Sequence, residues 1–549
     1  MTLFIKTEEK KGVSVPETQR LIGTPNHQEN ECVVLVSPTH SQHFSVTHEY
    51  EGFEEAGDAD KKRKDLLIRN IKYTVSFCFM SFCLIFISRG IFRRETPVSM
   101  GAGPIVAFCV MWLLIAWLGM LEGGQGSLVG LQPIDRELYK ESHKSAYKCS
   151  GLVCNGDSLN SFIVGRQFLV VLVVFCLNLV CTPIEAPPPP PDGGPLGAPP
   201  LPPLDKGFLE SFLDSGLPVM LITVILGQLA AEVNATNCML DFINTPLMVV
   251  TTWICLAIEA SGLLHATYLV NCFFHLFDDE PSSPEKEESK TTKEQAGYWG
   301  RTVLSTFLLG GALTVTWVAL LSGQTTMPLS GATSRIIAFI VLSCFLGILE
   351  AMQIAVFAVS KLPESELANY PTAHANSKLV FQGHNFKAFL TGRQICVTMS
   401  MFLLARLTTT QVRPTETVMG ISDDLQFFFN TGLPGALITT IVASLFWRIV
   451  ASSYPIPFLA NPTVKLTIQT CLALEASGIF SISWLLADVI RNLMDFRTDD
   501  SYLVKGKMES NHSWETSSTD EESAMLSDRA PSQEDFTFTS YGTTEVQSQ

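Results

Sequence analysis

The chain has 549 residues, of which 47% are hydrophobic and only 16% are charged, and its formal net charge is −16. Soluble domains carry about 25% charged residues, so this composition excludes an ordinary soluble protein and indicates a membrane protein. The acidic balance also excludes the basic surface that a nucleic-acid-binding protein presents.

The sequence lacks the short motifs of the common enzyme classes. It contains no Cys/His cluster with zinc spacing, no glycine-rich phosphate loop ending in Gly-Lys-Ser/Thr, and no Gly-x-Ser-x-Gly elbow. We therefore expect neither ATPase nor hydrolase activity, and we expect no organic cofactor.

A polar tail, residues 1–68, opens the chain, and we expect it to be disordered and cytoplasmic. Within it, the segment Glu17 to Ile22 resembles an acidic dileucine signal that would bind a sorting adaptor, although such short matches also arise by chance. The basic run Lys61 to Lys64 directly precedes the first apolar segment. Basic residues at this position predict that the flank stays in the cytoplasm.

Long apolar segments follow one another through most of the chain. About 20 apolar residues are needed to cross the hydrocarbon core of a bilayer. Ten segments meet this length: 70–91, 102–121, 162–184, 212–233, 247–277, 301–321, 335–359, 389–407, 427–450 and 463–490. The sequence therefore predicts an all-α integral membrane protein with ten transmembrane helices.

These spans divide into two groups of five. The first repeat is predicted over 69–277 and the second over 301–490, with an acidic loop over 278–300 between them. A proline-rich loop, 187–203, interrupts the first repeat and would act as a stiff spacer or bind a proline-recognising module. The last segment, 491–549, is acidic and rich in Ser and Thr, and we expect a disordered cytoplasmic tail.

One octapeptide occurs twice. Cys255 to Gly262 reads CLAIEASG, and Cys471 to Gly478 reads CLALEASG. Each copy carries a glutamate, Glu259 or Glu475, into an apolar segment. Because a charge at the bilayer centre costs about 3 kcal/mol, such residues face a protein interior or a wet cavity. Both are candidates to bind a coupling cation, and the alternative is a carboxyl group held neutral or bonded to a neighbouring helix.

Three further motifs recur in the same order in the second half. The matched pairs are Glu122-Gly-Gly-Gln125 with Glu350-Ala-Met-Gln353, Gly165-Arg166-Gln167 with Gly392-Arg393-Gln394, and Gly216-Leu-Pro218 with Gly432-Leu-Pro434. Two copies of an odd number of spans must lie in the membrane with opposite orientations. We therefore expect two inverted five-helix repeats, an arrangement that builds secondary transporters with a substrate site near the midplane.

The matched polar residues suit a small hydroxylated solute. Glu122 and Gln125 are three residues apart and therefore share one helix face, which we place at a helix end. A glutamine amide both donates and accepts hydrogen bonds, whereas a carboxylate only accepts them. Arg166 and Arg393 would neutralise the glutamates or bind an anionic substrate. The alternative is that these clusters are helix-end caps and salt bridges. Glu232 and Arg448 occupy matching positions with opposite charge.

The Glu-Gly-x-Gln and Gly-Arg-Gln motifs, together with Cys238-Met-Leu-Asp241, resemble the silicon transporters of silica-building unicellular eukaryotes over about residues 70–490. The resemblance implies sodium-coupled uptake of silicic acid across the plasma membrane. It also implies a substrate path formed by Glu122, Gln125, Arg166, Gln167, Gln353, Arg393 and Gln394. The chain departs from the pattern at Ala351, where the family motif has glycine, and its tail lacks the coiled coil of many relatives.

We therefore expect a sodium-coupled carrier of silicic acid that works by alternating access. The expected substrate-binding residues are Glu122, Gln125, Arg166, Gln167, Glu350, Gln353, Arg393 and Gln394. The expected candidates for binding sodium, the only metal we expect, are Glu259, Glu475 and Asp241. We expect a multi-pass protein of the plasma membrane with both termini in the cytoplasm, and internal vesicles are the alternative location. The alternatives are an uncoupled facilitator, a carrier of boric acid or a polyol, and a receptor.

Overall fold

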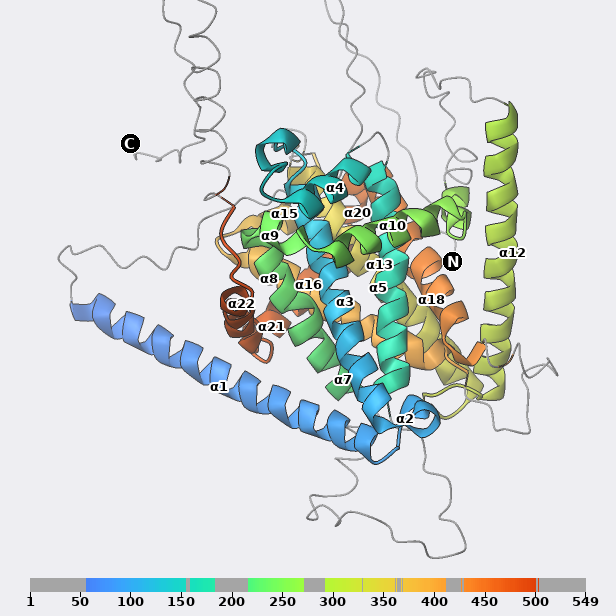
Figure 1. Ribbon diagram of the computed structural model, residues 1–549, viewed down its shortest axis with the longest axis horizontal. Coiled ribbons are helices and arrows are strands. Elements are labelled where there is room, and N and C mark those ends of the chain that lie inside the picture. Colours follow the sequence, from blue (N-terminus) through green and yellow to red (C-terminus); the bar gives the residue numbers. More distant parts are fainter. Residues whose placement is uncertain are drawn as a thin grey trace, which may run out of the picture. The chain divides into compact units, whose positions relative to one another are not determined.

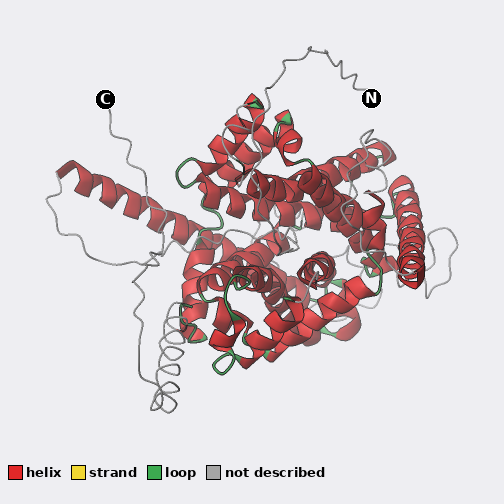
Figure 2. Cartoon of the chain, turned by 90° about the horizontal axis from the view of Figure 1, so that it is seen from above, coloured by secondary structure: helices red, strands yellow, loops and turns green. Residues whose placement is uncertain are grey.

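The chain is seen in a computed structural model (Figures 1 and 2), in which the described residues form helices and loops and no β-strand. The described residues are 56–154, 158–182, 216–270, 292–327, 329–360, 362, 367, 369–410, 426, 429–499 and 502. The predicted sorting motif, the proline-rich loop, most of the acidic loop and most of the C-terminal tail lie outside them. The expected all-α class is confirmed.

The described helices of the first half run from Ala56 to Tyr268. They are α1 (Ala56–Phe92), α2 (Pro97–Ala102), α3 (Pro104–Gly130), η1 (Arg136–Tyr139), α4 (Lys144–Val153), α5 (Ser158–Cys181), α7 (Leu217–Ile222), the π-helix η2 (Thr223–Leu229), α8 (Ala230–Asn237), α9 (Met239–Ile243), α10 (Pro246–Ala260) and η3 (His265–Tyr268).

The described helices of the second half follow the same order, without counterparts of α2 and η1. Its helices are α12 (Thr292–Ser322), α13 (Ala332–Ser360), α15 (Pro371–Phe381), α16 (Asn385–Thr408), α18 (Leu433–Thr440), the π-helix η5 (Ile441–Leu445), α19 (Phe446–Ser453), α20 (Pro455–Leu459), α21 (Pro462–Ala476) and α22 (Ile482–Leu493). In each half a π-helix interrupts the fourth span, and π-helical turns are frequent at functional sites.

Among the described residues, eight helices are long and apolar enough to cross a membrane, four in each half. They are Leu66–Phe92, Pro104–Gly130, Ser158–Cys181, Leu217–Asn237, Gln295–Ser322, Ala332–Ser360, Asn385–Thr408 and Leu433–Ser453. The protein is therefore a multi-pass membrane protein.

The fifth and tenth predicted spans, 247–277 and 463–490, are not continuous helices. Each begins with a helix of 15 residues, α10 or α21, which ends inside the octapeptide. Such a helix is about 22 Å long, which is shorter than the hydrocarbon core of about 30 Å. The expectation of ten full-length spans is therefore not confirmed, and the difference lies in these two segments.

Local sequence explains where α10 and α21 begin and end. Thr245 and Asn461 cap their N-termini with side-chain oxygens that accept hydrogen bonds from backbone N–H groups, and a proline follows each cap. Just beyond the C-termini, Gly262 and Gly478 have φ angles of 79° and 74°. This left-handed conformation suits glycine and stops a helix, so the octapeptide is a helix terminator.

The octapeptide also packs against the Gly-Arg-Gln motif. A Cβ atom added to Gly165 on α5 would overlap the carbonyl oxygen of Cys255 on α10, and one added to Gly392 on α16 would overlap that of Cys471 on α21. Each glycine therefore allows two helix backbones to approach closely. This contact holds the arginine and glutamine that follow the glycine in a fixed place.

The first helix of each half forms hydrogen bonds with the residues that follow the octapeptide in the other half. Ser305 on α12 donates a hydrogen bond to the Leu263 carbonyl at 2.6 Å and accepts one from the Ala266 N–H at 3.0 Å. Ser76 on α1 makes the matching pair of hydrogen bonds with Ile479 and Ile482. Each half therefore contacts the other through an equivalent pair of hydrogen bonds.

The two halves run in the same direction. A Cβ atom on Gly432, which precedes α18, would lie 3.2 Å from atoms of both Phe175 and Thr409. Phe175 lies about 14 Å past Arg166 along α5, and Thr409 lies about 24 Å past Arg393 at the end of α16. Because the two arginines line one cavity, antiparallel helices would separate Phe175 and Thr409 by about 38 Å. The helices are therefore parallel.

Figure 1 agrees with this direction, since the equivalent helices α4 and α15 lie at the same end of the bundle, opposite α2. The expectation of inverted halves is wrong. The physical reason is the break in the fifth segment: four full spans, an even number, return the chain to the side on which it started. The halves are related by an axis along the bundle, as in the second class of transporter repeats.

We predict that Gly165→Ala and Gly392→Ala each destabilise the protein by about 1–3 kcal/mol, because the added methyl group must separate two packed backbones. The check is the thermal stability of the detergent-solubilised protein.

The matched control is Gly311→Ala, in the middle of α12, where an added Cβ meets no atom within 4 Å. This change should be neutral or stabilising by up to about 1 kcal/mol, since alanine favours a helix over glycine. Equal effects at all three positions would contradict the close-packing explanation.

Candidate functional site

A cavity of about 120 Å³ lies between the two halves and is large enough for several water molecules. Among the described residues, its lining combines three glutamates, three arginines, four glutamines and eight other residues. The lining residues are Glu122, Gln125, Gly126, Val129, Arg166, Gln167, Val170, Glu232, Thr236, Glu350, Gln353, Ile354, Phe357, Arg393, Gln394, Val397, Met401 and Arg448. The structure thus brings together all eight residues expected to bind substrate.

The glutamate and glutamine pairs lie within their helices. Glu122 and Gln125 belong to α3, which continues to Gly130, and Glu350 and Gln353 belong to α13, which continues to Ser360. The expectation that they lie at helix ends is wrong, because the apolar run ends before the helix does. Their spacing of three residues nevertheless places both members of each pair on the cavity, as expected.

Each arginine of the Gly-Arg-Gln motifs pairs with a glutamate of its own half. Arg166 Nη2 forms an ion pair with Glu122 Oε2, and Arg166 Nε donates a hydrogen bond to the Leu121 carbonyl at 2.9 Å. Arg393 Nη1 lies 3.7 Å from Glu350 Oε2. The first pair is tight and the second is loose, although both arginines are buried. Pairing of this kind is what allows charges to lie inside a membrane protein.

The glutamines of the same motifs bond across the halves. Gln167 donates to Glu350 Oε1 at 3.2 Å, and Gln394 donates to Glu122 Oε1 at 3.3 Å. Each glutamate therefore holds an arginine from its own half and an amide from the other half. This crossed arrangement ties the two halves together at the centre of the cavity.

Two other amides have no such partner. Within the described part of the chain, the side chains of Gln125 and Gln353 make no hydrogen bond, although both line the cavity. Arg393 also has two buried nitrogen atoms, Nε and Nη1, without a hydrogen-bond partner. Buried polar groups normally find partners. These groups can therefore bind a ligand that offers both donors and acceptors.

Sequence reasoning missed two polar residues of the network. Gln228, in the π-helix η2, donates a hydrogen bond to Glu122 Oε1 at 3.2 Å, and Thr398 on α16 donates to Gln228 Oε1. A single glutamine in an apolar span was the available signal for Gln228. Glu232 and Arg448, noted only as matched positions of opposite charge, both line the cavity.

Apolar side chains lie on both sides of the polar layer. One group, Val129, Ile354 and Phe357, lies towards the C-terminal ends of α3 and α13, past the Glu/Gln pairs. The other group, Val170, Val397 and Met401, lies past the arginines along α5 and α16. Because α5 follows α3 back through the membrane, these two groups border the polar layer from opposite sides.

The three residues expected to bind sodium do not line the cavity. Glu259 and Glu475 lie at the ends of α10 and α21 and are half-buried. Asp241 lies in α9, next to the cavity rather than within it: a Cβ atom on Gly123, the neighbour of Glu122, would overlap the ring of Phe242. The structure therefore separates these carboxylates from the eight substrate candidates.

Asp241 instead holds the segment that follows α22. Its carboxylate accepts a hydrogen bond from the Arg497 N–H at 2.7 Å and one from the Tyr502 hydroxyl at 3.3 Å, and it lies 3.0 Å from His143 Nε2. Burial raises the pKa of Asp241, but the hydrogen bonds from His143, Arg497 and Tyr502 hold that pKa below its usual range.

Two neighbouring residues complete this contact. Asp499 accepts hydrogen bonds from the N–H groups of Met239 and Leu240 at 2.8 and 2.9 Å. Burial raises the pKa of Cys238 to about 11, so its thiol is protonated at neutral pH. Among the described residues, no group of three His, Cys, Asp or Glu side chains could hold a metal ion. The Cys-Met-Leu-Asp segment is therefore a docking site for the chain's own C-terminal segment.

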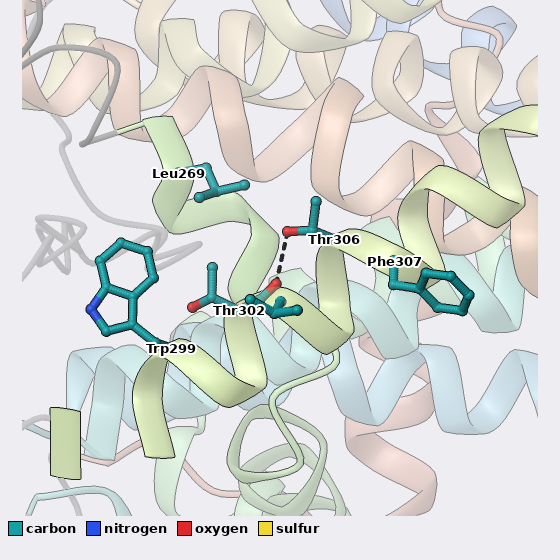
Figure 3. Close-up of a pocket in the computed structure, with 6 residues that line it drawn as sticks. Leu269, Trp299, Thr302, Thr306 and Phe307 are labelled. Atoms are coloured by element: carbon teal, nitrogen blue, oxygen red, sulfur yellow. Dashed lines mark hydrogen bonds between the residues drawn. The ribbon is translucent and has the colours of Figure 1, made fainter. Parts of the chain in front are cut away.

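A second, larger hollow of about 420 Å³ lies on α12 and is apolar (Figure 3). It is lined by Leu269, Trp299, Thr302, Val303, Thr306 and Phe307. Both threonine hydroxyls donate to carbonyl groups of their own helix, at 2.9 and 2.7 Å. This hollow therefore offers little to a polar solute, unlike the cavity between the halves.

A family model described as silicon transporter matches residues 65–541, which is most of the chain. The match extends beyond the expected 70–490 into the C-terminal tail. No curated protein and no solved structure matches the chain.

We predict that Glu122 and Arg166 are energetically coupled. Glu122→Gln and Arg166→Gln should each destabilise the protein, and the double variant should be less destabilised than the sum of the two by about 0.5–3 kcal/mol. The looser pair formed by Glu350 and Arg393 is the matched comparison and should show a smaller coupling. Thermal unfolding of the solubilised single and double variants measures the coupling energy of each pair. Additive effects at Glu122 and Arg166 would contradict the ion pair.

We predict that acid releases the C-terminal segment. A carboxylate with a lowered folded-state pKa stabilises the fold fully above its unfolded pKa of about 3.9, and this contribution is lost as the pH falls through the folded value. Between about pH 6 and about pH 3, wild type should therefore lose more stability than Asp241→Asn, which cannot titrate there. Thermal unfolding of both proteins across this pH range is the measurement. Equal losses of stability in wild type and Asp241→Asn would contradict the prediction.

Proposed function

Since the chain belongs to the silicon transporter family, we propose that it takes up silicic acid through the cavity between its halves. Silicic acid is small, tetrahedral and uncharged near neutral pH, and its four hydroxyl groups both donate and accept hydrogen bonds. A cavity for such a solute needs groups of both kinds, with some of them free.

The unpaired amides of Gln125 and Gln353 are the observation that carries this proposal. They come from equivalent positions of the two halves and offer both donors and acceptors to a bound solute. The neighbouring glutamines, Gln167 and Gln394, are already bonded to the glutamates. The free amides therefore replace the hydration shell of silicic acid, while the bonded ones keep the cavity in shape. Arg393 Nε, a buried nitrogen without a hydrogen-bond partner among the described residues, supplies a further donor.

We propose that transport is sodium-coupled and follows alternating access. The two apolar groups that border the polar layer support this, because each can close one side of the cavity. Parallel halves related by an axis along the membrane normal can rock against each other around a central site, as inverted halves do. Coupling then requires that sodium and silicic acid both favour the closed form.

The proposed location is the plasma membrane, with both termini in the cytoplasm. An even number of spans places the two termini on one side, and the basic run that ends at Lys64 supports the cytoplasmic side. The loop between α3 and α5 carries Arg136, Lys140, Lys144 and Lys148 on the same side, which fits this orientation.

The test is uptake of silicic acid by cells that express the protein. Gln125→Ala and Gln353→Ala should each lower uptake about tenfold or more, because the loss of one hydrogen bond of about 1.4 kcal/mol corresponds to a factor of ten. Gln382→Ala, at an exposed position after α15, is the matched control and should transport normally.

Three further measurements test the proposal. Boric acid and a polyol should compete poorly with silicic acid, and strong competition by either would identify a different substrate. Replacing sodium by choline should abolish concentrative uptake, whereas an uncoupled facilitator would continue. Wild-type protein that reaches the membrane and moves no silicic acid would refute the proposed function.

A further inference from the structure

Among the described residues that line the cavity, one glutamate and one arginine form no ion pair, and they occupy equivalent positions of the two halves. Glu232 on α8 and Arg448 on α19 are 216 residues apart, the same shift that relates the octapeptides. Both line the cavity with the two Arg–Glu pairs. The lining thus carries three glutamates and three arginines, and four of these six form ion pairs.

The remaining two are not paired with each other. Arg448 Nη1 donates a hydrogen bond to Gln167 Oε1 at 3.3 Å, which links it to the crossed network. Within the described residues, Glu232 makes no hydrogen bond and no ion pair, and its side chain is exposed. Glu232 is therefore the one cavity carboxylate, among those described, whose oxygen atoms are all free to bind a ligand.

The surroundings of Glu232 suit a small cation. Thr236 lies one helical turn further along α8, so the two side chains share a face, and it also lines the cavity. The Thr236 hydroxyl donates its proton to the Val233 carbonyl at 2.9 Å, which leaves its oxygen lone pairs as acceptors. Carboxylate and hydroxyl oxygens are hard ligands, which alkali-metal cations prefer to nitrogen or sulfur.

The equivalent place in the other half cannot bind a cation, because it carries the guanidinium of Arg448. Arg448 thus breaks the internal symmetry at this position, whereas the Glu/Gln and Arg/Gln pairs of the cavity occur in both halves. The helix directly before α8 in the chain is the π-helix η2, and π-helical turns are frequent at functional sites.

We propose that Glu232, with Thr236, binds a single sodium ion in the cavity, and that Arg448 keeps the matching position free of one. This inference rests on the proposed function and names the coupling-ion site within it. The sodium ion neutralises Glu232, the one carboxylate without a partner among the described residues that line the cavity, and lies next to the bound solute, so each can favour the occupancy of the other. Glu259 and Glu475, outside the cavity, take no part.

The first experiment measures silicic acid uptake in sodium and in choline medium. Wild-type uptake should rise with sodium along a curve with a Hill coefficient of about one. Glu232→Gln should reduce uptake in sodium to about the level of choline medium. Glu259→Gln and Glu475→Gln make the same chemical change outside the cavity and should keep full sodium dependence. Sodium dependence retained by Glu232→Gln would overturn the proposal, and so would uptake driven by a proton gradient alone.

The second experiment separates sodium binding from transport. The purified protein should melt at a higher temperature in sodium chloride than in choline chloride of equal ionic strength, because a ligand of the folded state stabilises it. Glu232→Gln should lose this shift while it keeps the wild-type melting temperature in choline, and Glu475→Gln should keep it. A shift of wild-type size in Glu232→Gln would overturn the proposal.

The two experiments also distinguish this inference from the proposed function. If wild type moves no silicic acid but shows a sodium-dependent melting shift that Glu232→Gln removes, the substrate is wrong and the cation site stands. If silicic acid uptake is robust and sodium-dependent in Glu232→Gln, the transport function stands and the cation site is wrong.

Discussion

The structure depends on the pairing of buried charges, because an unpaired charge inside an apolar helix bundle is energetically costly. Glu122 and Glu350 lie in the middle of apolar helices, where an unpaired carboxylate would be costly. Each is held by an arginine of its own half and by an amide of the other half, so neither half can satisfy its own glutamate completely. The requirement to neutralise buried charge therefore also fixes how the halves meet, and the meeting place becomes the cavity.

The geometry around the cavity depends on features that do not line it. Gly165 and Gly392 allow α10 and α21 to pack directly on α5 and α16, and the octapeptide ends each of those short helices with a glycine of positive φ. The repeated octapeptide is thus a structural element. Its glutamate lies at the end of a short helix, which explains how a charged residue is tolerated in so apolar a segment without forming part of the cavity.

The two halves are parallel and not inverted, and this bears on how they can enclose a central site. Five predicted spans in each half led to the expectation of inverted repeats. The glycine that stops α10 leaves four full spans in the first half, and the second half also has four. The contacts around Gly432 show that the halves are parallel. A central site between two halves survives this correction, because parallel repeats also enclose such a site. The two halves differ within the cavity above all at Glu232 and Arg448, which occupy equivalent positions with opposite charge.

The sequence by itself determined the membrane class, the duplication and eight of the polar residues that line the cavity, because apolar length and repeated motifs are local properties of the chain. It also pointed to Glu232 and Arg448 as matched opposites. Only the tertiary structure decided which amides are free, that Gln228 and Thr398 join the network, and that Asp241 binds the C-terminal segment. These depend on contacts between residues more than a hundred positions apart. No local pattern encodes such contacts, because they arise only when the helices pack.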